Sequence, residues 1–101
     1  MTRIVVSPQA NTDVEEILDH LFEVAGIAIA DRYAGDLQEL QDRLAMFPES
    51  GALRPQLGRD TRIAVLSPYL VIYDYSADGE TLTFVRVLDG RRNITRRLVR
   101  G

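Results

Sequence analysis

Two long helical patterns follow one another with a single residue, Gly26, between them. In both patterns apolar side chains recur every three or four residues, which is the period of a helix with one buried face. The first set lies within residues 8–25 and comprises Ala10, Val14, Ile17, Leu18, Leu21 and Ala25. The second set lies within residues 27–47 and comprises Ala30, Tyr33, Leu37, Leu40, Leu44 and Phe47. Because one glycine leaves almost no linker, the two helices are predicted to form an antiparallel hairpin.

Residues at the helix ends fit this interpretation. Ser7 is a suitable N-cap, and Pro8 suits the first helical position, where its missing N–H has no consequence. Gly26 is the usual residue type at a helix C-terminus. The second helix is expected to span residues 27–46, because Pro48 disfavours helical geometry in the residue before it.

The rest of the chain indicates strands. Runs of β-branched and aromatic residues predict strands at 3–6, 61–67, 69–75 and 81–88. Asp78-Gly79 is a strong hairpin turn signal, and residues 48–60 are a loop by composition. The order β-α-α-β-β-β predicts an α+β fold, in which an antiparallel sheet carries a helical hairpin on one face. A chain of 101 residues is expected to form one domain over residues 1–101.

Charge divides the chain into two halves. Residues 1–50 carry three arginines and ten acids, net −7, and residues 51–101 carry nine arginines and five acids, net +4; the sum is the formal net charge of −3. There is no lysine, and six arginines lie within residues 84–101. This asymmetry suggests one surface for a basic partner and another for an acidic one, although many surface charges are merely solvated.

Composition excludes several kinds of site. The absence of cysteine excludes disulfides and thiolate metal sites. His20, the only histidine, is expected to be solvated on the first helix, so no metal site is predicted. No phosphate-binding glycine loop is present, so neither a cofactor nor a small-molecule substrate is predicted. No apolar run is long enough to span a membrane and no signal peptide is recognisable, so a cytoplasmic protein is expected.

Three tyrosines share one face of a predicted strand. Tyr69, Tyr73 and Tyr75 alternate with other residues, and side chains two apart point to the same side of a strand. They could stack on nucleic-acid bases. They could also pack under the helices with their hydroxyls at the rim, and packing is the favoured interpretation.

Arg86 lies in the last predicted strand, where alternation places Leu82, Phe84 and Leu88 on its side. An arginine on an apolar strand face requires a partner or an edge position, because desolvating its charge is costly. Asp74 on the neighbouring strand is the expected partner.

Arg91 and Arg92 follow that strand. They are expected to lie beside Arg54, Arg59 and Arg62 if the loop of residues 48–60 folds over the same end of the sheet. Such a cluster could bind phosphates or an acidic peptide.

Three segments together resemble the RelE/ParE superfamily of toxin–antitoxin toxins, most nearly the ParE branch, also known as plasmid-stabilisation proteins. They are SPQANTDVEEI at the first helix, ADRY with LAMFPESG along the second, and YLVIYDY with TFVRVLDGRR near the end. Their order and spacing extend over nearly the whole chain. The resemblance implies a small toxin that forms a hetero-oligomer with a ParD-like antitoxin. ParE-type toxins poison DNA gyrase, whereas RelE-type toxins cut messenger RNA on the ribosome, and fold alone does not distinguish them.

The C-terminal side chains favour gyrase as the target. RelE-type sites combine basic residues with a C-terminal tyrosine or histidine, and no Tyr, His, Lys or Glu follows Arg86. Asp89 stands where many family members have histidine. The resemblance therefore implies growth inhibition by binding, with no catalytic residue. The candidates for contact with the target are Arg62, Arg86, Arg91, Arg92, Arg96 and Arg97.

A basic toxin surface suits an acidic, amphipathic antitoxin segment that folds on binding. The expected groove lies between the helical hairpin and the sheet. Its candidate residues are Leu37, Leu40, Leu44, Phe47, Arg54 and Arg59. The same apolar side chains could instead form only the seam between the helices.

Two other functions stay open at this stage. One is a RelE-like endoribonuclease, in which the arginines act with one of the three tyrosines. The other is a degenerate family member that binds its antitoxin without poisoning anything. The tail, residues 93–101, either contacts the target or serves only to pack.

Overall fold

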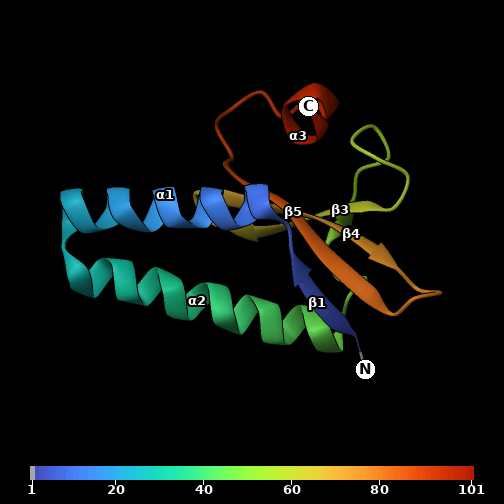
Figure 1. Ribbon diagram of the computed structural model, residues 1–101, viewed down its shortest axis with the longest axis horizontal. Coiled ribbons are helices and arrows are strands. Elements are labelled where there is room, and N and C mark those ends of the chain that lie inside the picture. The colour runs from blue at the N-terminus through green and yellow to red at the C-terminus, as the bar shows by residue number, and fades with distance from the viewer. Residues whose placement is uncertain (1) are drawn as a thin grey trace.

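The computed structural model describes residues 2–101 and contains five strands and three helices within them (Figure 1). The elements in chain order are β1 (Arg3–Val6), α1 (Pro8–Ala25), α2 (Ile27–Met46), β2 (Ala52–Leu53), β3 (Thr61–Leu66), β4 (Tyr69–Ser76), β5 (Thr81–Asp89) and α3 (Arg96–Arg100). Every predicted helix and strand is present, with bounds that differ by one residue at most. The short strand β2 and the short helix α3 were not predicted, because two and five residues are too few to show a periodic pattern.

The sheet has the order β1-β5-β4-β3-β2. Strands β2 to β5 pair with their neighbours in antiparallel fashion, as predicted. β1 instead lies parallel to β5, with Arg3 opposite Thr81. The sheet is therefore mixed. The two turns that join β3, β4 and β5 fix the direction of β5, and β1 takes the remaining edge of that strand.

The helical hairpin forms as predicted and is tied to the sheet at its start. Ser7 caps α1: its Oγ accepts a hydrogen bond from the N–H of Ala10 at 3.0 Å and donates to the carbonyl of Val85 at 2.9 Å. Gly26 joins the helices at a φ of 87°, a conformation that disfavours residues with a Cβ. The far end of the hairpin projects beyond the sheet in Figure 1, so Ala25 is exposed although it belongs to the predicted apolar face.

Both faces of the sheet carry an apolar cluster. We call the side under α1 and α2 the hairpin face; its buried residues are Ala10, Leu40, Leu44, Ala64, Val71, Tyr73, Leu82, Phe84 and Val87. We call the opposite side the tail face, because α3 covers it; its buried residues are Leu57, Ile72, Val85, Leu88 and Val99. The predicted fold had a cover on one face only, so the second cluster is a finding of the structure.

β5 contains a bulge beside Arg86, so its side chains do not alternate between the two faces as predicted. Ile72 of β4 lies opposite Arg86, but the next residue, Tyr73, lies opposite Phe84, so β5 has one extra residue at Val85. After the bulge, the side chains of β5 change sides. Phe84 therefore packs on the hairpin face and Leu88 on the tail face, and the expectation that Leu88 shares a side with Phe84 is wrong.

Candidate functional site

Arg86 makes its ion pair with α1 and not with β4. Its Nε and Nη2 donate to the two carboxylate oxygens of Asp13 at 2.7 and 3.0 Å. The same carboxylate accepts the backbone N–H of Val87 at 3.0 Å. Asp74, the predicted partner, is engaged elsewhere. In the part of the chain that the structure describes, the pairing of β1 with β5 ends at Phe84, and the first turns of α1 follow there and bring Asp13 to the guanidinium.

A third hydrogen bond joins the guanidinium of Arg86 to the tail. Its Nη1 donates to the carbonyl of Leu98 in α3 at 2.9 Å, and only 19% of the side chain is exposed. The hydrogen bonds with Asp13 raise the pKa of Arg86 above its ordinary value, against the opposing effect of burial. Arg86 therefore connects α1, β5 and α3, and has few donors left for a target.

A second arginine clamp holds the other end of the tail. Nη1 and Nη2 of Arg100 each donate to the carboxylate of Asp74 at 2.8 Å, and Nε donates to the carbonyl of Leu57. Asp74 also accepts from the hydroxyl of Thr61. Burial alone would raise the pKa of Asp74, but the hydrogen bonds from Arg100 and Thr61 outweigh it, so the pKa is lowered.

The tail between the two clamps presents uncompensated charge. Arg92, Arg96 and Arg97 are exposed and make no ion pair within residues 2–101. Arg92 and Arg97 line the same open depression of about 670 Å³ together with Asn93, Thr95 and Leu98. The buried side chain of Val99, which is 1% exposed, anchors this segment to the sheet. The arrangement is a fixed display of cations that suits an anionic surface.

Arg91 differs from its neighbour Arg92. Its Nε and Nη2 donate to Asp89 at 3.0 and 2.6 Å. The side-chain hydrogen bond from Arg91 is the main reason that the pKa of Asp89 falls to about 2. Asp89 therefore offsets most of the charge of Arg91 at neutral pH, and Arg91 adds little to the tail cations.

The five arginines expected in one cluster lie at two ends of the sheet. Arg62 pairs with Tyr73 in register, whereas Asp89, just before Arg91 and Arg92, pairs with Tyr69 at the other end of β4. Four residues of strand separate the two positions, which is about 13 Å. The expected cluster is wrong. β3 and β5 both run antiparallel to β4 and are therefore parallel to each other, so the start of β3 and the end of β5 lie at opposite ends of the sheet.

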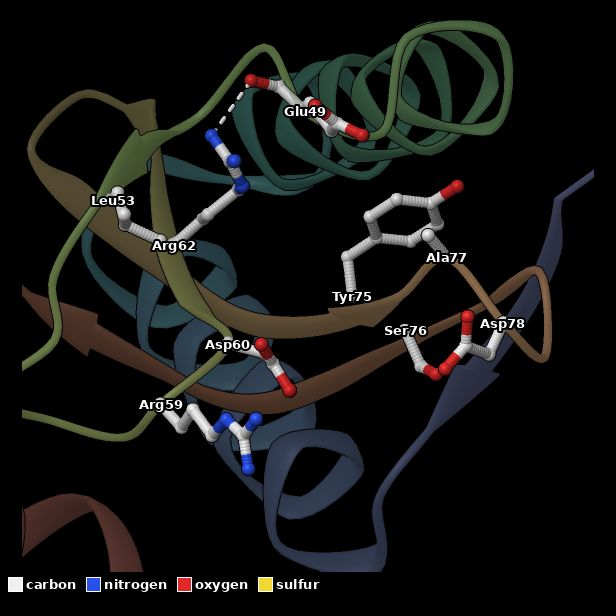
Figure 2. A pocket seen from close by; sticks show the side chains of 9 residues that line it. All are labelled: Glu49, Leu53, Arg59, Asp60, Arg62, Tyr75, Ser76, Ala77 and Asp78. Atoms are coloured by element: carbon white, nitrogen blue, oxygen red, sulfur yellow. Dashed lines mark hydrogen bonds between the residues drawn. The ribbon is translucent and has the colours of Figure 1, made fainter.

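Arg59 and Arg62 line a polar pocket of about 320 Å³ at the β2–β3 end of the sheet (Figure 2). The full lining is Glu49, Leu53, Arg59, Asp60, Arg62, Tyr75, Ser76, Ala77 and Asp78. Arg62 points toward the loop after α2, where its Nη1 donates to the carbonyls of Glu49 and Gly51 at 2.8 and 2.9 Å. With two arginines and three acids, the pocket has no excess of positive charge to hold an anion.

Two of the candidate antitoxin contacts are core residues. Leu40 and Leu44 are 2% and 1% exposed and pack on the hairpin face. Leu37 is partly buried against the same cluster. Phe47 is 59% exposed. Arg54 and Arg59 are exposed as well. The accessible part of this set therefore lies at the end of α2 and along the following loop.

The tyrosines pack, which was the favoured interpretation. Tyr73 is fully buried; its hydroxyl donates to the carbonyl of Pro48 and accepts the N–H of Gly51. Tyr69 and Tyr75 are partly buried against the hairpin-face cluster. Tyr69 meets the ring of Tyr33 edge-on, with centroids 6.1 Å apart. His20 is exposed on α1, as expected.

The sequence did not point to Arg100, which binds Asp74 26 residues away. It also did not point to Asp13, which binds Arg86 73 residues away. No local pattern marks such a pair. Three exposed apolar side chains at the end of the hairpin, Phe22, Val24 and Ile27, were also missed, although their positions off the periodic apolar face are visible in the sequence. No helix within residues 2–101 combines the length and apolar character needed to cross a membrane.

Comparison with known proteins agrees with this fold. Residues 4–94 match the family model of the ParE toxin of the type II toxin–antitoxin system parDE. Toxin ParE3 of Caulobacter vibrioides is 26% identical over 98 residues, which cover 97% of this chain and 96% of that protein. Toxin ParE1 of Mycobacterium tuberculosis is 30% identical over 97 residues, which cover 96% of this chain and 98% of that protein.

A solved structure described as the chromosomal ParDE TA system from P. aeruginosa has the same fold, with a TM-score of 0.73 at 22% identity. The match covers 88% of this chain and 96% of that chain. The family model and the curated relatives extend over both the helical hairpin and the strands that carry the arginines. The chain therefore belongs to the ParE toxin family of type II toxin–antitoxin systems.

Proposed function

We propose that this ParE toxin inhibits DNA gyrase by binding and is neutralised by a ParD-like antitoxin. The observation that carries the proposal is a set of exposed arginines on the anchored tail and just before it, Arg92, Arg96 and Arg97, which make no ion pair within residues 2–101. A target that contains DNA offers a dense array of phosphates to such a set. No bond-making group is required for inhibition of this kind.

The anchoring of the tail strengthens this proposal. Val99 is buried, and Arg86 and Arg100 hold the backbone and the end of α3. Side chains on a fixed backbone lose less conformational freedom on binding than side chains on a mobile tail. The affinity for a DNA-containing target is therefore expected to fall steeply with salt concentration, as phosphate contacts do.

The antitoxin is expected to use the accessible part of the surface at the end of α2. Met46 and Phe47 are 71% and 59% exposed and line an open depression of about 480 Å³. Leu53 is 48% exposed on β2, and Arg54 follows it. Apolar anchors beside an arginine match an acidic, amphipathic segment that folds on binding.

A supercoiling and cleavage assay tests the target. Purified protein without antitoxin is mixed with gyrase, ATP and relaxed plasmid. The expected result is accumulation of linear DNA, and addition of the ParD-like antitoxin should prevent it. Undisturbed supercoiling in the presence of a demonstrably folded protein would refute the gyrase assignment.

A pair of double variants tests the tail cations. Arg92→Gln/Arg97→Gln removes two charges from the tail depression. Arg32→Gln/Arg43→Gln removes two exposed charges from α2 that make no ion pair within residues 2–101. We expect the tail variant to need at least about tenfold more protein for half-maximal cleavage, because each phosphate contact contributes to binding, while the control stays near wild type. Truncation at Asn93 is a poorer test, since it also removes the buried Val99.

One observation favours a second candidate, a RelE-like endoribonuclease. Of the three tyrosines, Tyr75 alone lines the pocket of Figure 2, beside Arg59 and Arg62. In this candidate the Tyr75 hydroxyl would act on a ribose 2′-hydroxyl, with Arg59 as the cation beside it. Rapid transcript cleavage on induction, abolished by Tyr75→Phe, would support it. Intact transcripts during growth arrest would exclude it, and unaffected growth would indicate a member that only binds its antitoxin.

A further inference from the structure

The free end of the helical hairpin carries an unburied apolar run. We call residues 22–28 the hairpin tip. Phe22 is 55% exposed, and Val24 and Ile27 are each 65% exposed. Ala25 and Ala28 are exposed between and beside them. None of these side chains belongs to either core cluster.

These side chains are outside both buried clusters, and the hairpin is closed by Gly26, whose φ of 87° makes the tight connection. A run of exposed apolar residues costs solubility, and in soluble proteins it usually marks a contact surface. The hairpin tip also lies far from α3 and from the end of α2 in Figure 1.

Charge around the hairpin tip restricts its partner. Asp19, Glu23 and Asp31 flank it, all exposed, and no arginine or lysine occurs within residues 4–31. Arg32 is the next cation along the chain. Acidic side chains repel the phosphates of DNA and the surface of anionic membranes. A protein surface with an apolar pocket and a basic rim is the complementary partner.

We propose that the hairpin tip docks into an apolar pocket rimmed by lysine or arginine on a protein subunit of the target, with Phe22 as the anchor. The inference rests on the proposed function, in which the target is a complex of protein and DNA. The acidic hairpin tip contacts the protein component, and the tail arginines contact the DNA component. The opposite charges of the two halves of the chain then have separate roles.

The size of the hairpin tip fits one half of a two-point contact. Three apolar side chains bury far less than the roughly 1,600 Å² of a typical stable interface. Buried aromatic anchors nevertheless contribute much of the affinity in many interfaces. Two weak contacts on one rigid body reinforce each other, because the second forms at a high effective concentration.

The test compares variants with a closely matched control. Phe22→Ser/Val24→Ser removes the anchor and its neighbour. Val65→Ser replaces the same residue type as Val24 at the same 65% exposure on β3, outside residues 22–28. We expect the hairpin-tip variant to need at least about tenfold more protein for half-maximal plasmid cleavage by gyrase, with unchanged binding to the ParD-like antitoxin and an unchanged Tm. Val65→Ser should match wild type.

Two outcomes would overturn the inference: wild-type cleavage by the hairpin-tip variant, or loss of antitoxin binding with cleavage retained, which would assign the hairpin tip to the antitoxin. A second variant, Glu23→Arg, leaves the apolar side chains in place and should weaken cleavage most at low salt. If wild-type protein fails to act on gyrase, the proposed function fails instead. Growth arrest on induction then becomes the readout, and equal toxicity of the hairpin-tip variant and wild type would reject a role for the hairpin tip in target binding.

Discussion

The two faces of the sheet are closed by different physical means. Two helices of 18 and 20 residues cover the hairpin face, and nine buried residues fill the space between them and the sheet. A helix of five residues covers the tail face, with five buried residues beneath it and the loop before β3. The large cover is held chiefly by apolar burial, whereas the small cover depends on two arginine clamps. A short helix buries too little apolar area to stay in place without such polar bonds.

The largest expected effect is on the hairpin face. Phe84→Ala removes a ring that is 1% exposed in the middle of the sheet, and should lower the free energy of unfolding by about 3–5 kcal/mol. Val99→Ala on the tail face should cost about 2 kcal/mol, because fewer methyl groups are lost. Urea denaturation measures both. A cost for Val99→Ala as large as that for Phe84→Ala would contradict this expectation, because the valine loses less buried side chain.

The next largest loss of stability is expected for a substitution of Arg86, because its side chain connects the covers of both faces. Arg86→Met leaves Asp13, which is 11% exposed, without its cation, and should cost about 2–4 kcal/mol. Adding Asp13→Asn should recover part of the loss, since the amide oxygen can still accept the N–H of Val87. A double variant that is less stable than Arg86→Met would show that the ion pair is not the source of the cost. Thermal and urea unfolding give the measurement.

Arg100→Gln should loosen the cover of the tail face and leave the cover of the hairpin face nearly unchanged. The clamp with Asp74 is about one-third exposed, so solvent screening limits its contribution to about 1 kcal/mol. We expect faster hydrogen exchange at the amides of Val99 and Gly101, whose bonds hold α3 together, with little change on α1 and α2. Exchange that quickens equally everywhere would show that the tail and the hairpin open as one unit.

The smallest effect concerns pH. The pKa of Asp74 is lowered in the folded state from its ordinary value of 3.8, so its contribution is complete above that value and is lost as pH falls through the lowered pKa. Tail protection measured by hydrogen exchange should therefore decrease at acidic pH, below the range where an unfolded aspartate titrates. Asp74→Asn should flatten this dependence for the tail. An unaltered profile in that variant would assign the titration to another carboxyl group.

Much of the fold could be predicted because its signals are local. The N-cap at Ser7, the break at Gly26 and the stop before Pro48 depend on neighbouring residues, and all three lie where they were expected. The parallel placement of β1 and the bulge at Val85 were not predictable in this way, since pairing and register depend on residues far apart in the chain.

The candidate site was harder to predict than the fold. Residue types indicated which arginines are candidates for binding, but not which of them are engaged in ion pairs within the fold. Arg86 and Arg91 are bound to Asp13 and Asp89, whereas Arg92 makes no ion pair within the described residues. Helical periodicity placed Leu40 and Leu44 on an apolar face, and their burial assigns them to the core and not to the antitoxin surface. Charge and periodicity give the residue types at a surface, whereas exposure and pairing depend on three-dimensional contacts.

The sequence by itself determined the two long helices, the strands β1, β3, β4 and β5, their order and the division of charge between the two halves, because helical periodicity, capping and composition are properties of consecutive residues. Only the tertiary structure decided which arginines are used internally, that a second cluster lies beneath the tail, and that the hairpin tip projects uncovered. The physical reason is that an ion pair such as Arg86 with Asp13 joins residues 73 positions apart, and its existence follows from the path of the chain and not from any local pattern.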